Sequence, residues 1–133
     1  MLHAMAMMVL LTFIVGLIAA RTRFANVRSG EVTVRYFKLM QGQDVPERVI
    51  VTTRSFNNMF EVPVLFYVAC TLSISLGVVG PSGLLLAWLF VALRYAHACI
   101  HLTSNGLLQR MLVFWASFVC VLLLWVNLVW QQI

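Results

Sequence analysis

The sequence predicts an all-α integral membrane protein, a single domain over residues 1–133 that forms a bundle of four transmembrane helices. Apolar residues make up 62% of the chain and charged residues only 10%, whereas a soluble domain has about 45–50% and about 25%. The apolar residues are grouped into four long segments, and most basic residues lie between the first two. A chain this short has too little interior to hide so much apolar surface from water.

The first predicted span covers residues 2–20, which contain no charged residue. Its length is close to the roughly 20 residues that a helix needs to cross a bilayer. A secretory signal peptide is the alternative, but its basic residues precede the apolar stretch, whereas Arg21 and Arg23 follow this one. We therefore expect a retained first helix, followed by a polar loop over residues 21–43.

The second predicted helix begins near Pro46, with Asp44 as a capping residue before it and Glu47 in its first turn. The helical pattern continues for about 34 residues, or about 50 Å at 1.5 Å per residue. Because the hydrocarbon core of a bilayer is only roughly 30 Å thick, we expect the span itself at residues 56–79. The first turns then project into the cytoplasm, and Pro63 kinks the apolar half.

The third and fourth predicted spans cover residues 84–103 and 107–131, with a short polar turn between them. Of the nine Lys and Arg residues, seven fall between positions 21 and 54, and the turn at 80–83 has none. Since basic loops stay in the cytoplasm, we expect a multi-pass protein of the inner or cell membrane with both termini outside. Nothing in the sequence indicates the folded basic surface that nucleic-acid binding requires, so no nucleic-acid partner is expected.

The three cysteines, Cys70, Cys99 and Cys120, all lie within predicted spans and lack CxxC or CxxH spacing. Cysteines in this setting usually behave as small apolar residues. We therefore expect neither a metal site nor a catalytic thiol.

Polar residues inside spans are the candidates for function, because an ionisable group in a membrane is costly unless it is paired or lines a cavity. On each of two helices, the second and the third, three of them recur at spacings of three and four, which place them on one face, and Asn57 and Tyr95 lie beside these stripes. They all lie in the cytoplasmic halves of their helices, so we expect them to meet in one pocket. The candidates are Arg54, Asn57, Asn58, Glu61, Arg94, Tyr95, His97, His101 and Arg110.

Two interpretations of this cluster remain open from the residues alone. Glu61 and Arg94 could form an interhelical ion pair, with the neighbouring amide and imidazole groups as hydrogen-bonding partners. Alternatively, the excess of arginine over glutamate binds an anionic ligand, and carboxylates suit guanidinium groups because the two pair in a bidentate way.

The second-helix stretch RSFNNMFEVP, residues 54–63, resembles the signature of the MAPEG superfamily, the membrane-associated proteins of eicosanoid and glutathione metabolism. This superfamily includes microsomal glutathione transferases and the leukotriene and prostaglandin synthases. The family spacing of arginine, asparagine and glutamate is kept by Arg54, Asn58 and Glu61. Further matches are Arg94 and His97 on the third helix and Arg110 near the start of the fourth.

The resemblance implies a homotrimer of four-helix subunits that binds glutathione between neighbouring subunits, at a site facing the cytoplasm. It implies that the candidate residues of the second and third helices hold the charged ends of the tripeptide. Arg110 is then the catalytic residue, because a fixed positive charge lowers the pKa of a nearby thiol and so favours the reactive thiolate. The implied activity is a glutathione-dependent transferase or peroxidase acting on lipophilic electrophiles drawn from the membrane lipid.

The sequence departs from the family pattern at two positions. His101 stands where the family has a tyrosine, so a hydroxyl contact to glutathione is lost or replaced by an imidazole. Pro63 follows Glu61 more closely than in the eicosanoid synthases, which shifts the kink. The alternative function is a non-catalytic protein of the same fold that binds lipid or another anionic ligand. A channel is less favoured, because the charges gather at one membrane face.

Overall fold

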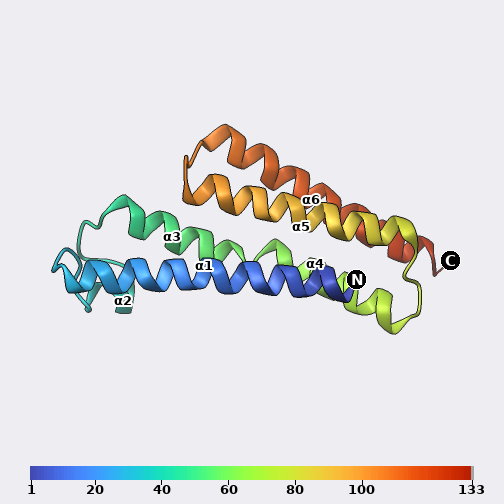
Figure 1. Cartoon of the computed structure of the whole chain (residues 1–133), viewed down its shortest axis with the longest axis horizontal. Helices are drawn as coiled ribbons and strands as arrows, with labels where there is room; N and C mark the ends of the chain where they lie inside the picture. The colour runs from blue at the N-terminus through green and yellow to red at the C-terminus, as the bar shows by residue number, and fades with distance from the viewer. Residues whose placement is uncertain (133) are drawn as a thin grey trace.

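The computed structural model describes residues 1–132, and their secondary structure is entirely helical. Figure 1 shows the helices in chain order. Their bounds are α1 Leu2–Arg28, α2 Tyr36–Leu39, α3 Glu47–Asn58, α4 Val62–Ser75, α5 Pro81–Leu102 and α6 Leu107–Trp130.

The helices form two halves of one bundle (Figure 1). α1 lies along α3 and α4, while α5 and α6 form an antiparallel hairpin. α1 also contacts α5, and α4 contacts α6, so the two halves pack against each other. Both termini lie toward the end of the bundle that carries the α4–α5 connection, and α2 lies at the opposite end.

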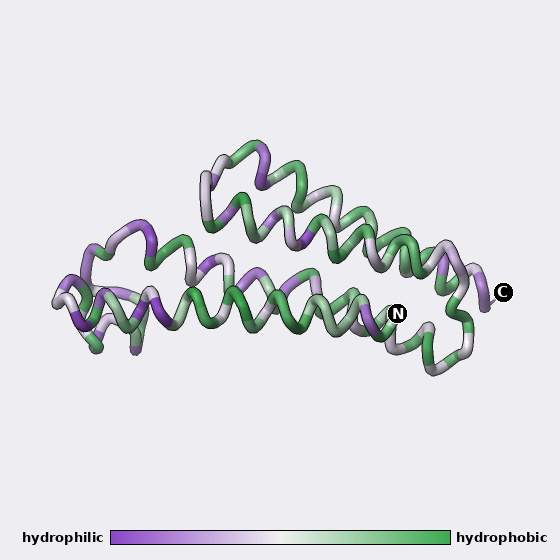
Figure 2. Tube along the Cα trace, viewed as in Figure 1, coloured by the Kyte–Doolittle hydropathy of each residue, from purple (hydrophilic) through white to green (hydrophobic). Residues whose placement is uncertain are grey.

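Four helical segments are long and apolar enough to cross a membrane: α1, α3 and α4 taken together, α5 and α6. Figure 2 shows hydrophobic residues along the middle of the bundle and hydrophilic residues gathered around α2. Large apolar side chains also point outward, as Leu17, Leu85 and Trp115 do at 58%, 69% and 56% exposure. An outer surface of this kind suits lipid, and the predicted all-helical membrane bundle is confirmed.

The core lies where the two halves meet. Phe66 of α4 and Phe90 of α5 are fully buried, and their rings stack with centroids 4.5 Å apart. Trp125 of α6 donates its indole N–H to the carbonyl of Leu65, 3.2 Å away. These contacts fix α5 and α6 against α4, and thereby set the position of the polar residues at the other end of α5.

α1 remains helical to Arg28, eight residues beyond the end of the expected span at residue 20. The added stretch contains neither glycine nor proline, and the Asn26 side chain donates to the carbonyl of Thr22 at 2.7 Å. The helix ends at Ser29, followed by Gly30 with φ of 78°, a conformation that glycine adopts without steric cost.

The second predicted helix is interrupted rather than only kinked. α3 ends at Asn58 and α4 begins at Val62, with Glu61 as its N-cap residue. Pro63 lacks the N–H that would donate to the carbonyl of Met59, and its ring would clash with that carbonyl in a continuous helix. The interruption therefore falls one turn before the proline, within the stretch that carries the candidate site residues.

Candidate functional site

A polar cavity of about 310 Å³ lies between the C-terminal end of α3, the C-terminal half of α5 and the first two turns of α6. Its volume is at the lower end of the range of small-molecule sites, roughly 300–1,000 Å³. Its lining residues are Arg54, Asn57, Asn58, Glu61, His97, His101, Arg110, Met111 and Phe114. Seven of these nine were candidates from the sequence, so the structure brings most of the predicted cluster together.

The interruption between α3 and α4 gives the first wall of the cavity. Arg54 and Asn57 are exposed on α3, and Asn58 is its last residue. The Asn58 amide nitrogen donates to the Glu61 carboxylate at 2.9 Å. This bond holds the carboxylate of the α4 N-cap residue beside the end of α3.

Arg94 of α5 is fully buried, with 0% exposure, and it lies against the end of α3. Its Nη2 atom donates to the backbone carbonyl of Asn58 at 3.0 Å and also to the Asn58 side-chain oxygen. The last carbonyls of a helix have no partner within the helix and carry partial negative charge. Arg94 therefore caps α3, and it is connected to Glu61 through Asn58.

Two further nitrogens of Arg94, Nε and Nη1, are buried and have no hydrogen-bond partner within residues 1–132. Buried polar atoms in proteins are normally hydrogen-bonded. The guanidinium carbon also lies 5.9 Å from the centroid of the Phe114 ring. Arg94 thus combines a structural contact with α3 and two unpartnered donors, and it is fully buried and is not one of the residues that line the cavity.

His97 and His101 form the wall contributed by α5. They are only 3% and 5% exposed, and their ring centroids are 5.6 Å apart. His97 Nδ1 and both ring nitrogens of His101 lack a partner among the described residues. Imidazole nitrogens can donate or accept a hydrogen bond, so both side chains can bind a polar ligand in the cavity.

Arg110 lies in the first turns of α6 and is positioned by the turn before it. Its Nη1 atom donates to the side-chain oxygen of Asn105 at 2.6 Å. Asn105 has φ of 49°, a left-handed conformation in which asparagine is enriched. The positive end of the α6 dipole adds to the charge of Arg110, so this part of the cavity favours an anion.

The charges around the cavity are unequal. Arg54 and Arg110 line it and Arg94 lies directly behind it, whereas Glu61 is the one acid among the lining residues. A ligand with more than one carboxylate and a single ammonium group would match this arrangement.

Tyr95 is one sequence candidate that the structure does not bring to the cavity. Its hydroxyl donates to the backbone carbonyl of Met7 on α1, 2.9 Å away, and it is not among the lining residues. The next residue along α5 after Arg94 is rotated by about 100° around the helix, so it faces α1.

Sequence reasoning missed Met111 and Phe114, which line the cavity, and Asn105, which positions Arg110. Phe114 could have been found, because it lies four residues after Arg110 on the same face of a helix. Asn105 was harder to predict as a partner of Arg110, because an asparagine in a turn usually hydrogen-bonds the backbone of that turn.

Comparisons with known proteins place the whole chain in one group. A family model described as the MAPEG family matches residues 1–130. No curated protein and no solved structure matched the chain.

Proposed function

This chain belongs to the MAPEG family, and from that premise we propose that it is a membrane-bound glutathione-dependent transferase or peroxidase acting on lipophilic electrophiles. The observation that supports this most is the set of buried, unpartnered nitrogens on Arg94, His97 and His101 beside a cavity that carries two more arginines. A cavity with this excess of donors and positive charge suits the two carboxylates of glutathione.

Each charged group of glutathione has a candidate partner. Arg54 binds a carboxylate directly, because guanidinium and carboxylate form paired charge-assisted hydrogen bonds. Arg94, which is buried behind the cavity wall, adds positive charge to the same site. Glu61 binds the ammonium group, and Asn57 and Asn58 bind the peptide backbone of the ligand. His97 and His101 complete the wall behind the peptide, whereas Tyr95 contacts α1 and is assigned no contact with the ligand.

Arg110 is the proposed catalytic residue. A free thiol has a pKa near 8.5, and a fixed positive charge beside it lowers that value, so more thiolate is present at neutral pH. Arg110 and the N-terminus of α6 both supply positive charge at one end of the cavity. The thiolate then attacks an electrophile that is dissolved in the bilayer, forms a thioether and expels the leaving group, such as a halide. With a lipophilic peroxide, it attacks one oxygen and releases the alcohol, and a second glutathione converts the resulting sulfenate into glutathione disulfide and water.

We also propose a homotrimer, with the cavity completed by a neighbouring subunit and facing the cytoplasm. The family supports the trimer, and the basic residues between positions 21 and 54 support the orientation. Arg54, Asn57 and Glu61 are exposed in the single chain, as expected for groups that a bound ligand or a neighbouring subunit would cover.

The first test measures glutathione binding to the detergent-solubilised protein by isothermal titration calorimetry. Arg54→Ala should weaken binding about tenfold or more, because one charge-assisted hydrogen bond contributes about 1.5–3 kcal/mol. Arg48→Ala is the matched control, since Arg48 is an exposed arginine of the same helix that does not line the cavity. Absence of binding by the wild-type protein at millimolar glutathione would exclude the proposed function.

The second test concerns catalysis. With an aryl halide as a generic electrophile, Arg110→Ala should lower the conjugation rate and raise the pH at which thiolate forms, while glutathione still binds. Arg110→Lys, which keeps the charge, should recover part of the rate. Equal rates in wild type and Arg110→Ala would contradict the role assigned to Arg110.

One observation favours the alternative of a non-catalytic protein that binds lipid or another anionic ligand. The Arg94 guanidinium already donates to the end of α3 through Nη2. In addition, a histidine stands at position 101, where the family has a tyrosine. A polar cluster that stabilises the interrupted helix would persist without any reaction. Glutathione binding without measurable conjugation or peroxide reduction would support this alternative.

A further inference from the structure

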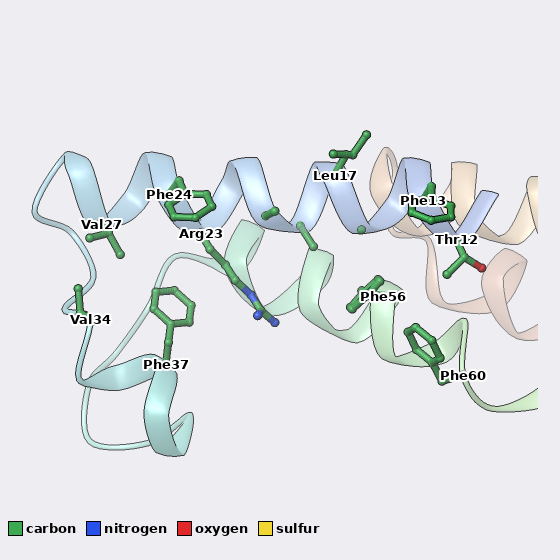
Figure 3. Close-up of a pocket in the computed structure, with 13 residues that line it drawn as sticks. Thr12, Phe13, Leu17, Arg23, Phe24, Val27, Val34, Phe37, Phe56 and Phe60 are labelled. Carbon is green, nitrogen blue, oxygen red and sulfur yellow. The ribbon is translucent and has the colours of Figure 1, made fainter. Parts of the chain in front are cut away.

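A second and larger hollow lies on the opposite face of α3 from the polar cavity. It is a groove of about 820 Å³ between α1, α3 and the segment that contains α2 (Figure 3). α3 contributes Phe56 to it, and the interruption after α3 contributes Phe60, whereas Arg54, Asn57 and Asn58 line the polar cavity. The two hollows therefore share α3 but have no lining residue in common.

The lining of the groove is apolar except at two positions, Thr12 and Arg23. The Thr12 hydroxyl already donates to the carbonyl of Met8 at 3.0 Å. Phe13 and Phe24, which line the groove, are 67% and 77% exposed, so the groove opens at the outer surface of the bundle. A ligand in the groove would contact apolar side chains along most of its length and one charged side chain.

Arg23 is that charged group. Figure 3 shows its side chain extending from α1 toward α3, between Phe37 and Phe56. Its Nη2 atom donates to the Thr53 hydroxyl at 3.2 Å, and its guanidinium carbon lies 5.6 Å from the centroid of the Phe37 ring. Its Nε atom is buried without a partner in the described part of the chain, and no acidic residue lines the groove.

The part of the groove on the N-terminal side of Arg23 matches one leaflet of a bilayer in length, and the lining continues beyond Arg23 to Val27. The stretch of α1 from Phe13 to Arg23 rises about 15 Å at 1.5 Å per residue. This is half of the roughly 30 Å hydrocarbon core. Arg23 lies at the end of this stretch that adjoins the basic loop, where lipid headgroups meet water.

We propose that this groove binds one anionic phospholipid of the surrounding membrane. One acyl chain lies along α1 beside Ala20, next to the Phe56 ring that covers Gly16, and the phosphate accepts hydrogen bonds from Arg23. The groove supplies apolar contact along one leaflet, and the positive charge at its polar end selects an anionic headgroup over a zwitterionic one. This lipid site is independent of glutathione binding, because it uses none of the residues of the polar cavity.

The test is native mass spectrometry of the full-length protein, delipidated in detergent and titrated with phosphatidylglycerol, phosphatidylcholine or palmitate. The wild-type protein should retain phosphatidylglycerol about fivefold more tightly than phosphatidylcholine of the same chain length, the contribution expected from one arginine at a headgroup. Arg23→Gln should abolish this preference. Ala20→Trp should fill the groove and weaken the binding of both phospholipids.

Arg28→Gln is the matched control, because it removes the same charge from an exposed position of the same helix that does not line the groove. It should leave the preference unchanged. Equal effects of the two arginine variants would overturn the site at Arg23, and tighter retention of palmitate than of phosphatidylglycerol would overturn the phospholipid assignment. A loss of oligomer mass in Ala20→Trp with unchanged lipid binding would assign the groove to a second copy of the chain instead.

Discussion

At the scale of single residues, Arg94 shows how one side chain can serve both the fold and the site. It is fully buried and donates to the end carbonyl of α3, yet two of its nitrogens have no partner in the described chain. An arginine placed so deep is costly unless the structure compensates its charge. The partial negative charge at the end of α3 and the carboxylate of Glu61, reached through Asn58, provide this compensation.

We predict that Arg94→Met lowers the free energy of unfolding by about 2–3 kcal/mol, because a charge-assisted hydrogen bond is lost and the Asn58 carbonyl is left unpaired. Thermal unfolding in detergent would measure the change. Arg48→Met, at an exposed position of α3, should alter stability by less than about 0.5 kcal/mol. Similar stabilities of the two variants would show that the capping contact contributes little.

A second prediction at this scale concerns His101, which lines the cavity and whose two buried ring nitrogens have no partner in the described chain. If His101 donates a hydrogen bond to glutathione, His101→Tyr should retain most of the affinity, since a hydroxyl can also donate. His101→Phe should weaken binding about fivefold, the value of one net hydrogen bond. Calorimetric titration of both variants with glutathione measures these affinities. Equal losses of affinity in His101→Tyr and His101→Phe would contradict a donor role for His101.

At the scale of elements, the interruption between α3 and α4 positions the site. A continuous helix would pair the carbonyls at the end of α3 with the amides of α4. Because Pro63 has no N–H to donate, the chain breaks at Met59, and the end of α3 becomes available to Arg94. The same break places Glu61 at the start of α4, where Asn58 can donate to it.

Pro63→Ala should restore a donor for the Met59 carbonyl and favour a continuous helix. We expect slower amide hydrogen exchange over residues 59–64 and weaker glutathione binding, since Arg94 and Glu61 lose their places at the end of α3. Pro81→Ala, at the start of α5 where no helical hydrogen bond is lost, is the control. Unchanged exchange in Pro63→Ala would mean that contacts other than the proline maintain the break.

At the scale of the whole molecule, the distribution of basic residues determines orientation. Seven of nine lie between positions 21 and 54, and Figure 2 shows hydrophilic residues around α2 at one end of the bundle. Since basic loops remain in the cytoplasm, we expect both termini and the α4–α5 connection on the other side of the membrane.

This orientation predicts the behaviour of reporter fusions in a bacterial host. Alkaline phosphatase, which is active only outside the cytoplasm, should be active when fused after residue 132. The same enzyme fused after residue 104, in the turn between α5 and α6, should be inactive. The reverse pattern would invert the topology and would place the polar cavity on the outer side.

The sequence by itself determined the membrane class, the four apolar segments and most of the residues that line the polar cavity. Hydropathy can be summed along the chain without knowing the fold. In the same way, helical spacing predicts that Arg54, Asn58 and Glu61 share one face, whichever helix packs against them. The tertiary structure alone decided that α3 ends before Pro63, that Arg94 caps it, and that Tyr95 contacts Met7 on α1 rather than the cavity. The groove at Arg23 also depends on tertiary structure, because its walls come from segments that meet only when the helices pack. Spacing along one helix gives the direction of a side chain, whereas its contacts depend on which neighbours the packed bundle brings within reach.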